Sequence, residues 1–240
     1  MVDTATRPRR NERSHLRSRW PLRRRALLEL TSCFAGLTAA GLFTGWLLIG
    51  PLAGSALAEW DRDVAAWLAG RRNQTLDTLT DVGSGFSDTI VIIVSLSVLM
   101  VAMTLIWRRW RESLTLGVAL GLEASVFLLV STIVGRDRPP VEQLDTSPPT
   151  ASFPSGHTGA AFAFYIGLAV VVHWITRNQI ARVASMIAAA LIPMAVAVSR
   201  MYRGMHYATD VLVGAALGVT CVVVAVVLVR RAIARRGVET

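Results

Sequence analysis

Six long apolar stretches constrain this chain more than any other feature of its sequence. A helix needs around 20 apolar residues to cross the hydrocarbon core of a bilayer, which is about 30 Å thick. The sequence predicts such spans over residues 26–52, 89–107, 114–134, 157–175, 183–198 and 206–229. Hydrophobic residues make up 53% of the chain and the mean hydropathy is +0.49, values above those of ordinary soluble domains. The expected fold class is all-α, a six-transmembrane-helix bundle.

The positive charge is concentrated before the first span. Every basic residue is an arginine, nine arginines fall within the first 25 residues, and the net charge is +9. The sequence therefore predicts a basic tail over 1–25, a six-helix membrane domain over 26–232 and a short tail over 233–240. A basic tail that directly precedes an apolar span favours anionic lipid headgroups. We expect the bilayer as a partner and no nucleic acid.

Arginines between the spans predict the orientation. If six spans alternate, the arginine clusters lie on one side of the membrane, which the positive-inside rule makes cytoplasmic. Both termini are then cytoplasmic, and the loops 55–88, 135–156 and 199–205 face outward. The expected protein is a multi-pass protein of the cell membrane. The first span is longer than the apolar core of a secretory signal, which favours a retained helix. The clusters after the tail are Arg108-Arg109-Trp110-Arg111, Arg177 with Arg182, and Arg230-Arg231 with Arg235-Arg236.

Three short polar segments lie on the outer side in this topology. Histidine and arginine are scarce in hydrophobic proteins, yet two of the four histidines fall inside these segments, each beside a charged or hydroxyl partner. The topology was predicted from the positions of the arginine clusters, whereas the segments were identified by the chemistry of their residues. The two lines of evidence are therefore independent. The segments are Arg138-Pro139, Pro154-Ser155-Gly156-His157, and Ser199-Arg200 with His206 and Asp210.

The third segment predicts a nucleophile. His206 and Asp210 are four residues apart at the expected start of the last helix, so we expect their side chains to share a face. A carboxylate beside an imidazole fixes its tautomer and leaves the other nitrogen free to attack. The same pair could also bind a metal in a metal-dependent hydrolase, or be a solvated helix start.

The second segment predicts an anion site. Ser155 is placed to cap the following helix, Gly156 lets the backbone approach a ligand, and a helix N-terminus favours an anion. His157 would then lie beside that anion as a proton donor. Arg138 and Arg200 add planar guanidinium groups that match phosphate oxygens.

In their order and spacing, these segments resemble the type-2 phosphatidic acid phosphatase superfamily, particularly its actinobacterial members. The matching text is Gly135-Arg136-Asp137-Arg138-Pro139, then Pro154-Ser155-Gly156-His157, then Ser199-Arg200, His206 and Asp210. The resemblance implies a metal-independent, two-step phosphate transfer without a cofactor. It assigns attack on phosphorus to His206, orientation of His206 to Asp210, and protonation of the leaving oxygen to His157. Arg138, Ser155, Gly156 and Arg200 would hold the phosphoryl oxygens.

The first motif departs from the family pattern. The family has a lysine seven residues before the motif arginine, and Ser131 stands at that position here. We hypothesise that Arg136 or Arg203 supplies the missing charge, with Arg136 the tentative phosphate ligand.

Several other residues receive structural interpretations. Residues 60–68 carry apolar positions at helical spacing and predict a helix in the membrane interface. Glu123 lies inside the third span, where a carboxylate is costly, and a structural role is favoured over proton or substrate handling. Cys33 and Cys221 fall in apolar runs and predict no disulfide. His15 lies in the tail, and His173 is expected near the cytoplasmic end of its helix.

The expected function is hydrolysis of a lipid phosphate or diphosphate at the outer membrane face. Undecaprenyl or decaprenyl diphosphate is the first substrate prediction, and phosphatidic acid or phosphatidylglycerol phosphate follows. Three alternatives stay open: a vanadate-dependent halide oxidase, a non-catalytic lipid-binding or transport protein, and the metal-dependent hydrolase. The oligomeric state has no signal in the sequence.

Overall fold

The computed structural model describes residues 24–146 and 150–237. Within these residues every regular element is a helix, so the expected all-α class is confirmed. His15 and nearly all of the predicted tail over 1–25 lie outside the described residues. The helices are α1 (Arg24–Ile49), α2 (Ala56–Ala69), α3 (Gln74–Gly85), α4 (Thr89–Val101), the π-helix η2 (Ala102–Ile106), α5 (Trp110–Val134), α6 (Gly156–Ile175), α7 (Gln179–Tyr202) and α8 (Ala208–Gly237).

In the described part of the chain, six segments are long and apolar enough to cross a membrane, as the sequence predicted. They are α1, the run from α3 through η2, and α5 to α8. The fifth span is longer than expected, with Pro193 inside α7. The polar helix α3 was not predicted, because its residues are mostly Thr, Asp and Gly. The last helix begins at Ala208, so His206 precedes it.

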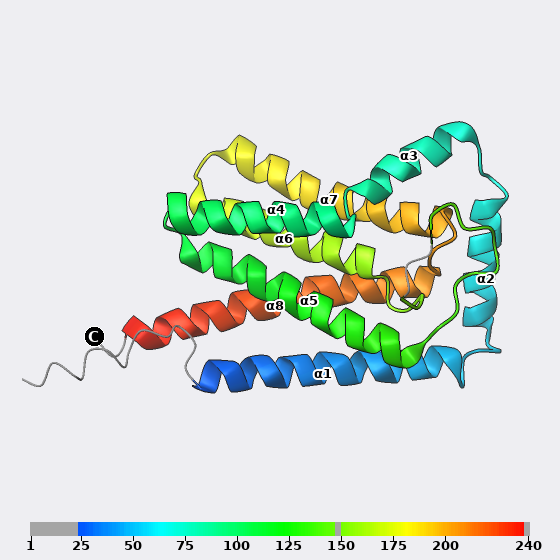
Figure 1. Cartoon of the computed structure of the whole chain (residues 1–240), viewed down its shortest axis with the longest axis horizontal. Helices are drawn as coiled ribbons and strands as arrows, with labels where there is room; N and C mark the ends of the chain where they lie inside the picture. The colour runs from blue at the N-terminus through cyan, green and yellow to red at the C-terminus, as the bar shows by residue number, and fades with distance from the viewer. Residues whose placement is uncertain (1–23, 147–149, 238–240) are drawn as a thin grey trace, which may run out of the picture.

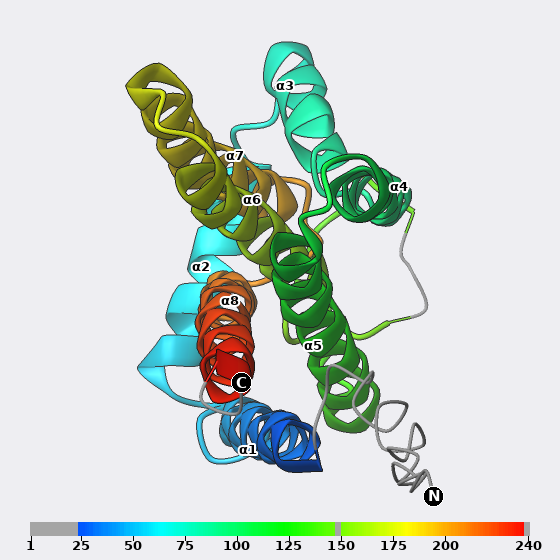
Figure 2. The ribbon, with the colours of Figure 1, turned by 90° about the vertical axis from the view of Figure 1, so that its left-hand side faces the viewer.

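The ends of the bundle differ (Figure 1). The start of α1 and the end of α8 lie at one end, where Arg235 pairs with Glu29 at 2.7 Å. At the other end, α2 runs across the bundle beside the loops that join α5 to α6 and α7 to α8. Seen along the bundle, α5 lies between α1 and α4 (Figure 2). The motif segments thus share the end that α2 covers.

The core connects α5 and α8 to the second motif. Leu122, Val126 and Val130 of α5 pack with Cys221 of α8 and with Phe153, which directly precedes the second motif. The helices α6 and α8 also approach closely, since a Cβ atom at Gly214 would meet the backbone of Ser155. This packing fixes the start of α6 against α8. Both cysteines are free, as predicted.

A helix is present where one was predicted over residues 60–68, namely α2. Trp60 and Trp67 are exposed, while Asp61 and Ala65 are buried against the bundle. The side of α2 that faces the protein therefore carries a buried acid.

Candidate active site

Hydrogen bonds join the three motif segments at the α2 end of the bundle. Arg138 Nη1 donates to the carbonyl of Met205 at 2.7 Å, which connects the first segment to the third. The backbone N–H of Ser155 donates to the carbonyl of Asp210 at 3.0 Å, which connects the second to the third. The segments that the sequence singled out therefore form one site.

His206 is held through one ring nitrogen. Its Nδ1 lies 2.6 Å from the carbonyl oxygen of Ser152, and its side chain is buried. A carbonyl oxygen can only accept, so in the neutral imidazole Nδ1 carries the hydrogen and Nε2 keeps its lone pair. Burial, helped by the charges of Arg200 and Arg138, holds the pKa of His206 well below its ordinary value. The ring is therefore a neutral imidazole at pH 7, the form in which Nε2 is a nucleophile.

Asp210 does not share a helix face with His206, contrary to expectation. Because α8 begins at Ala208, Asp210 lies in its first turn and accepts the N–H of Tyr207 at 2.9 Å. An acid at this position turns back to cap the helix start. The other partners of the Asp210 carboxylate are Ser152 Oγ and Arg136 Nη1. Asp210 is thus connected to His206 through Ser152, which contacts both.

Arg136 lies between two buried carboxylates. Its Nη1 pairs with Asp210, and its Nη2 pairs with Asp61 at 2.9 Å. Nη1 also donates to Thr209 Oγ1 at 2.8 Å. Although burial lowers the pKa of the Arg136 guanidinium, the Asp210 and Asp61 carboxylates together raise it overall. Arg136, which the sequence suggested as a phosphate ligand, therefore has carboxylate partners at both terminal nitrogens.

Asp61 is a residue that sequence reasoning missed. Besides Arg136, it accepts the Thr209 N–H at 3.0 Å and the Thr209 hydroxyl, and its side chain is 1% exposed. A signal existed, because Asp61 precedes Val64 and Ala65 by three and four residues, the spacing of one helix face. Asp61 joins α2 to the first turn of α8.

Arg200 is buried with one unpartnered nitrogen. Its Nη1 donates to Ser84 Oγ at 2.8 Å and to Asp145 at 2.6 Å, whereas Nε has no partner among the described residues. Asp145 also accepts from Arg203 Nε at 2.6 Å. Burial would raise the pKa of Asp145, but the two guanidinium groups outweigh it and lower that pKa. Asp145 could not be predicted from the sequence, since the loop around it has no regular pattern.

The second segment is built differently from the expected helix cap. Ser155 occupies the N-cap position of α6, but its hydroxyl pairs with Thr158 Oγ1 at 2.9 Å, so the expected side-chain cap is wrong. The first-turn N–H groups of a helix have no intrahelical acceptor, which leaves them available to an anion. A Cβ at Gly156 would lie 2.7 Å from Cζ of Phe127, so any other residue there would have to displace the Phe127 ring.

An uncharged residue, Ser131, stands at the position of the missing lysine. Ser131 is buried, and its hydroxyl lies 3.5 Å from the carbonyl of Ala151. Arg203, the other proposed substitute, pairs with Asp145 and with Asp81. Arg136 and Arg203, the two residues proposed to replace the lysine charge, are therefore both already in ion pairs.

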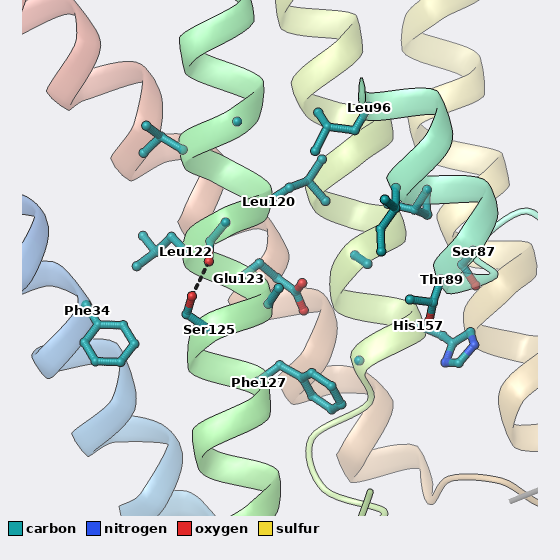
Figure 3. Close-up of a pocket in the computed structure, with 18 of the residues that line it drawn as sticks. Phe34, Ser87, Thr89, Leu96, Leu120, Leu122, Glu123, Ser125, Phe127 and His157 are labelled. Atoms are coloured by element: carbon teal, nitrogen blue, oxygen red, sulfur yellow. Dashed lines mark hydrogen bonds between the residues drawn. The ribbon is translucent and has the colours of Figure 1, made fainter. Parts of the chain in front are cut away.

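A cavity of about 1090 Å³ connects the site to the membrane-spanning helices (Figure 3). His157, His206, Arg138 and Gly156 line it at the site, and burial lowers the pKa of Arg138. Ser155, Arg200, Asp210 and Arg136 are not among the described lining residues. In the described part of the chain, no group of three or more His, Cys, Asp or Glu is arranged to hold a metal ion. The rest of the lining is mostly apolar and comes from α1, α4, α5 and α6, including Phe34, Ile92, Leu96, Leu120, Leu122 and Phe127.

Comparisons with known proteins agree with this geometry. A model of the PAP2 superfamily matches residues 112–234, just over half of the chain and all three motif segments. The comparison with curated proteins found no match.

Two solved structures share the fold. One is the crystal structure of a transmembrane PAP2-type phosphatidylglycerolphosphate phosphatase from Bacillus subtilis, with a TM-score of 0.65 and 21% identity over 82% of this chain and 92% of that chain. The other is Aquifex aeolicus LpxE, with a TM-score of 0.52 and 22% identity over 68% of this chain and 93% of that chain. The family match shows that the chain belongs to the PAP2 superfamily, and both solved structures share its fold of membrane-spanning helices.

Proposed function

We propose that the protein hydrolyses a lipid phosphate or diphosphate through a phosphohistidine intermediate at the outer membrane face. The observation that carries this proposal is the cavity itself. It joins two histidines and an arginine, His157, His206 and Arg138, to the apolar faces of four helices. A phosphate headgroup can reach the charged end while its hydrocarbon stays among apolar side chains.

In the first step, Nε2 of His206 attacks phosphorus and the bond from phosphorus to the lipid oxygen breaks. His157 donates its proton to that oxygen, so the lipid leaves as an alcohol, or as a monophosphate from a diphosphate. In the second step, water attacks the phosphohistidine, His157 accepts the proton of the water, and inorganic phosphate leaves. No metal or cofactor has a role in this scheme.

The remaining motif residues stabilise charge. Arg138, Arg200, Ser155 and Gly156 hold the phosphoryl oxygens, where preorganised donors are most effective. The unpartnered Nε of Arg200 supports this role, because a buried donor without an acceptor is costly unless a ligand supplies one.

Asp210 and Arg136 receive supporting roles. Asp210 positions His206 through Ser152, which donates its hydroxyl to Asp210 and accepts from His206. Arg136 holds Asp210, and we no longer favour it as a phosphate ligand, because both of its Nη atoms have carboxylate partners.

Polyprenyl diphosphates, such as undecaprenyl or decaprenyl diphosphate, are the substrates proposed from the sequence. Phosphatidic acid and phosphatidylglycerol phosphate are the alternative, supported by the fold shared with a phosphatidylglycerolphosphate phosphatase. The two classes differ in the atoms that follow the phosphate.

Phosphate release by the purified protein in detergent tests the proposal. The variant His206→Asn should abolish turnover, and His173→Asn is its matched control, because His173 is exposed towards the opposite end of α6. Labelled substrate quenched in base should leave phosphate on the wild-type protein and none on His206→Asn. Full activity of His206→Asn contradicts the proposal, and loss of activity in a strong chelator would favour the metal-dependent alternative.

A further inference from the structure

Glu123 is a buried acid that the proposed chemistry does not use. It lies in α5, its side chain is 2% exposed, and its Oε1 has no hydrogen-bond partner among the described residues. It lines the same cavity as His157 and His206. Figure 3 shows its carboxyl group directed from α5 towards α6, the helix that carries His157 near its start.

Helix packing places Glu123 close to the phosphate site. Phe127 of α5 packs against Gly156 at the start of α6, and Glu123 packs against Gly159. These two glycines are three residues apart, so the carboxyl lies about 5 Å deeper than the helix start. Glu123 is close to the site although it is well separated from Arg136 in the sequence, because α5 continues past the level of the α6 start before it ends. Atoms next to the phosphoester oxygen of a bound lipid would lie at this depth.

Three hydroxyl groups of the cavity lining are already satisfied. The hydroxyl of Ser125 donates to the carbonyl of Gly121 at 2.6 Å (Figure 3), and that of Thr31 donates to Leu27 at 2.8 Å. Ser87 likewise donates to Ser84 at 3.1 Å. Glu123 differs, because its carboxyl has no such partner in the described chain. A buried carboxyl in an apolar cavity is costly unless it is hydrogen-bonded.

The chemistry of the bound lipid decides whether Glu123 can be satisfied. A glycerolipid phosphate carries ester or hydroxyl oxygens within a few bonds of the phosphate. A protonated carboxyl can donate to an ester carbonyl, and a carboxylate can accept from a hydroxyl. A prenyl phosphate has only hydrocarbon at this position. Such a chain would leave the acid unpartnered.

Resting on the proposed function, we propose that Glu123 recognises the oxygen-bearing linker of a glycerolipid phosphate. It is then a specificity-determining residue that places this class ahead of prenyl substrates. From Phe127 to Leu114 the lining runs about 20 Å along α5, more than the roughly 15 Å of one leaflet's hydrocarbon. This stretch receives the acyl chain.

The test compares kcat/KM for dioleoyl phosphatidic acid and for farnesyl phosphate. The variant Glu123→Met removes the polar end at similar length, whereas Glu123→Gln keeps a donor and an acceptor. Ser125→Ala is the matched control, because it removes a polar group of the same helix that is already satisfied. We expect Glu123→Met to lower kcat/KM for phosphatidic acid about tenfold, with farnesyl phosphate unchanged and Glu123→Gln close to wild type.

Equal losses on both substrates, or none, overturn the inference. If Glu123→Met does not fold, wild-type protein is measured on phosphatidic acid and on an alkyl phosphate without ester oxygens. A preference of about tenfold for the ester substrate supports the inference, and equal rates overturn it. Wild-type protein that releases no phosphate from any lipid contradicts the proposed function instead.

Discussion

Asp61 provides a sharp test of how the site is held, because it lies outside all three motif segments. Its carboxylate pairs with Arg136 at 2.9 Å and accepts both the N–H and the hydroxyl of Thr209. Asp61→Ala leaves these three donors without their acceptor, and two of them belong to Thr209 in the first turn of α8. That turn also contains Asp210, which is connected to His206 through Ser152. We therefore expect losses of both stability and turnover.

The size of the effect follows from the burial of the pair. Removing one partner of a buried ion pair costs about 3–5 kcal/mol. The two side chains are 10% and 1% exposed, but Arg136 retains Asp210, so we take the lower end, about 3 kcal/mol. For a chain of this size, that loss lowers Tm by roughly 6–12 °C. A catalytic group displaced by about 1 Å can lose about 100-fold in rate, so kcat should fall by about 10- to 100-fold with little change in KM.

The assay combines thermal unfolding in detergent with phosphate release. Asp63→Ala is the matched control, since Asp63 is an exposed acid on the same helix, and it should behave as wild type. Asp61→Asn should be intermediate, because an amide keeps one acceptor but turns a donor towards Arg136 or Thr209. Wild-type Tm and kcat in Asp61→Ala would refute the reasoning. A lower Tm with unchanged kcat would restrict Asp61 to holding the fold.

Three further predictions concern the site. Ser152→Ala should lower kcat about tenfold, because it removes the hydroxyl donated to Asp210 while keeping the carbonyl that holds His206; an unchanged kcat counts against the connection through Ser152. Asp145→Asn should strengthen inhibition by inorganic phosphate several-fold, because Arg200 loses a carboxylate that competes with the anion. Weaker inhibition would show that Asp145 instead holds Arg200 in place. The lowered pKa of His206 means that the unfolded chain binds more protons below pH of about 6.5, so stability is lost as pH falls through that value. Tm measured from pH 7 to 5 should therefore fall more steeply for wild type than for His206→Asn, and parallel curves would contradict this.

The features that the sequence predicted well are those that depend on local pattern. A bilayer demands long apolar helices, so six spans follow from hydropathy alone, and the motif segments are recognisable by their residue types and spacing. The helix α3 was missed because it is polar and ends at a break before α4. The start of α8 was misplaced for another local reason, since hydropathy does not register the Asp210 side chain that caps it at Tyr207.

The features that the sequence did not reveal depend on contacts between distant segments. Asp145 meets Arg200 across 55 positions, and Asp61 meets Thr209 across 148. No sequence pattern distinguishes Asp145 from a solvated loop residue, and the helical spacing that places Asp61 on the face of Val64 and Ala65 does not identify its partners. Asp61 gains its partners only when α2 packs against the start of α8, and Asp145 only when the loop before α6 packs against the end of α7.

Asp61 and Glu123 show how hydrogen bonding separates positioning from recognition. Both are buried acids near the start of α6 or α8, yet Asp61 accepts hydrogen bonds from Arg136 and Thr209, whereas Glu123 Oε1 has no partner in the described chain. A satisfied carboxylate can only hold what it contacts, so Asp61 variants should slow all substrates alike. An unsatisfied carboxyl gains its hydrogen bond from a ligand, so Glu123 variants should change the ratio between substrates. The two acids thus separate turnover from selectivity within one site.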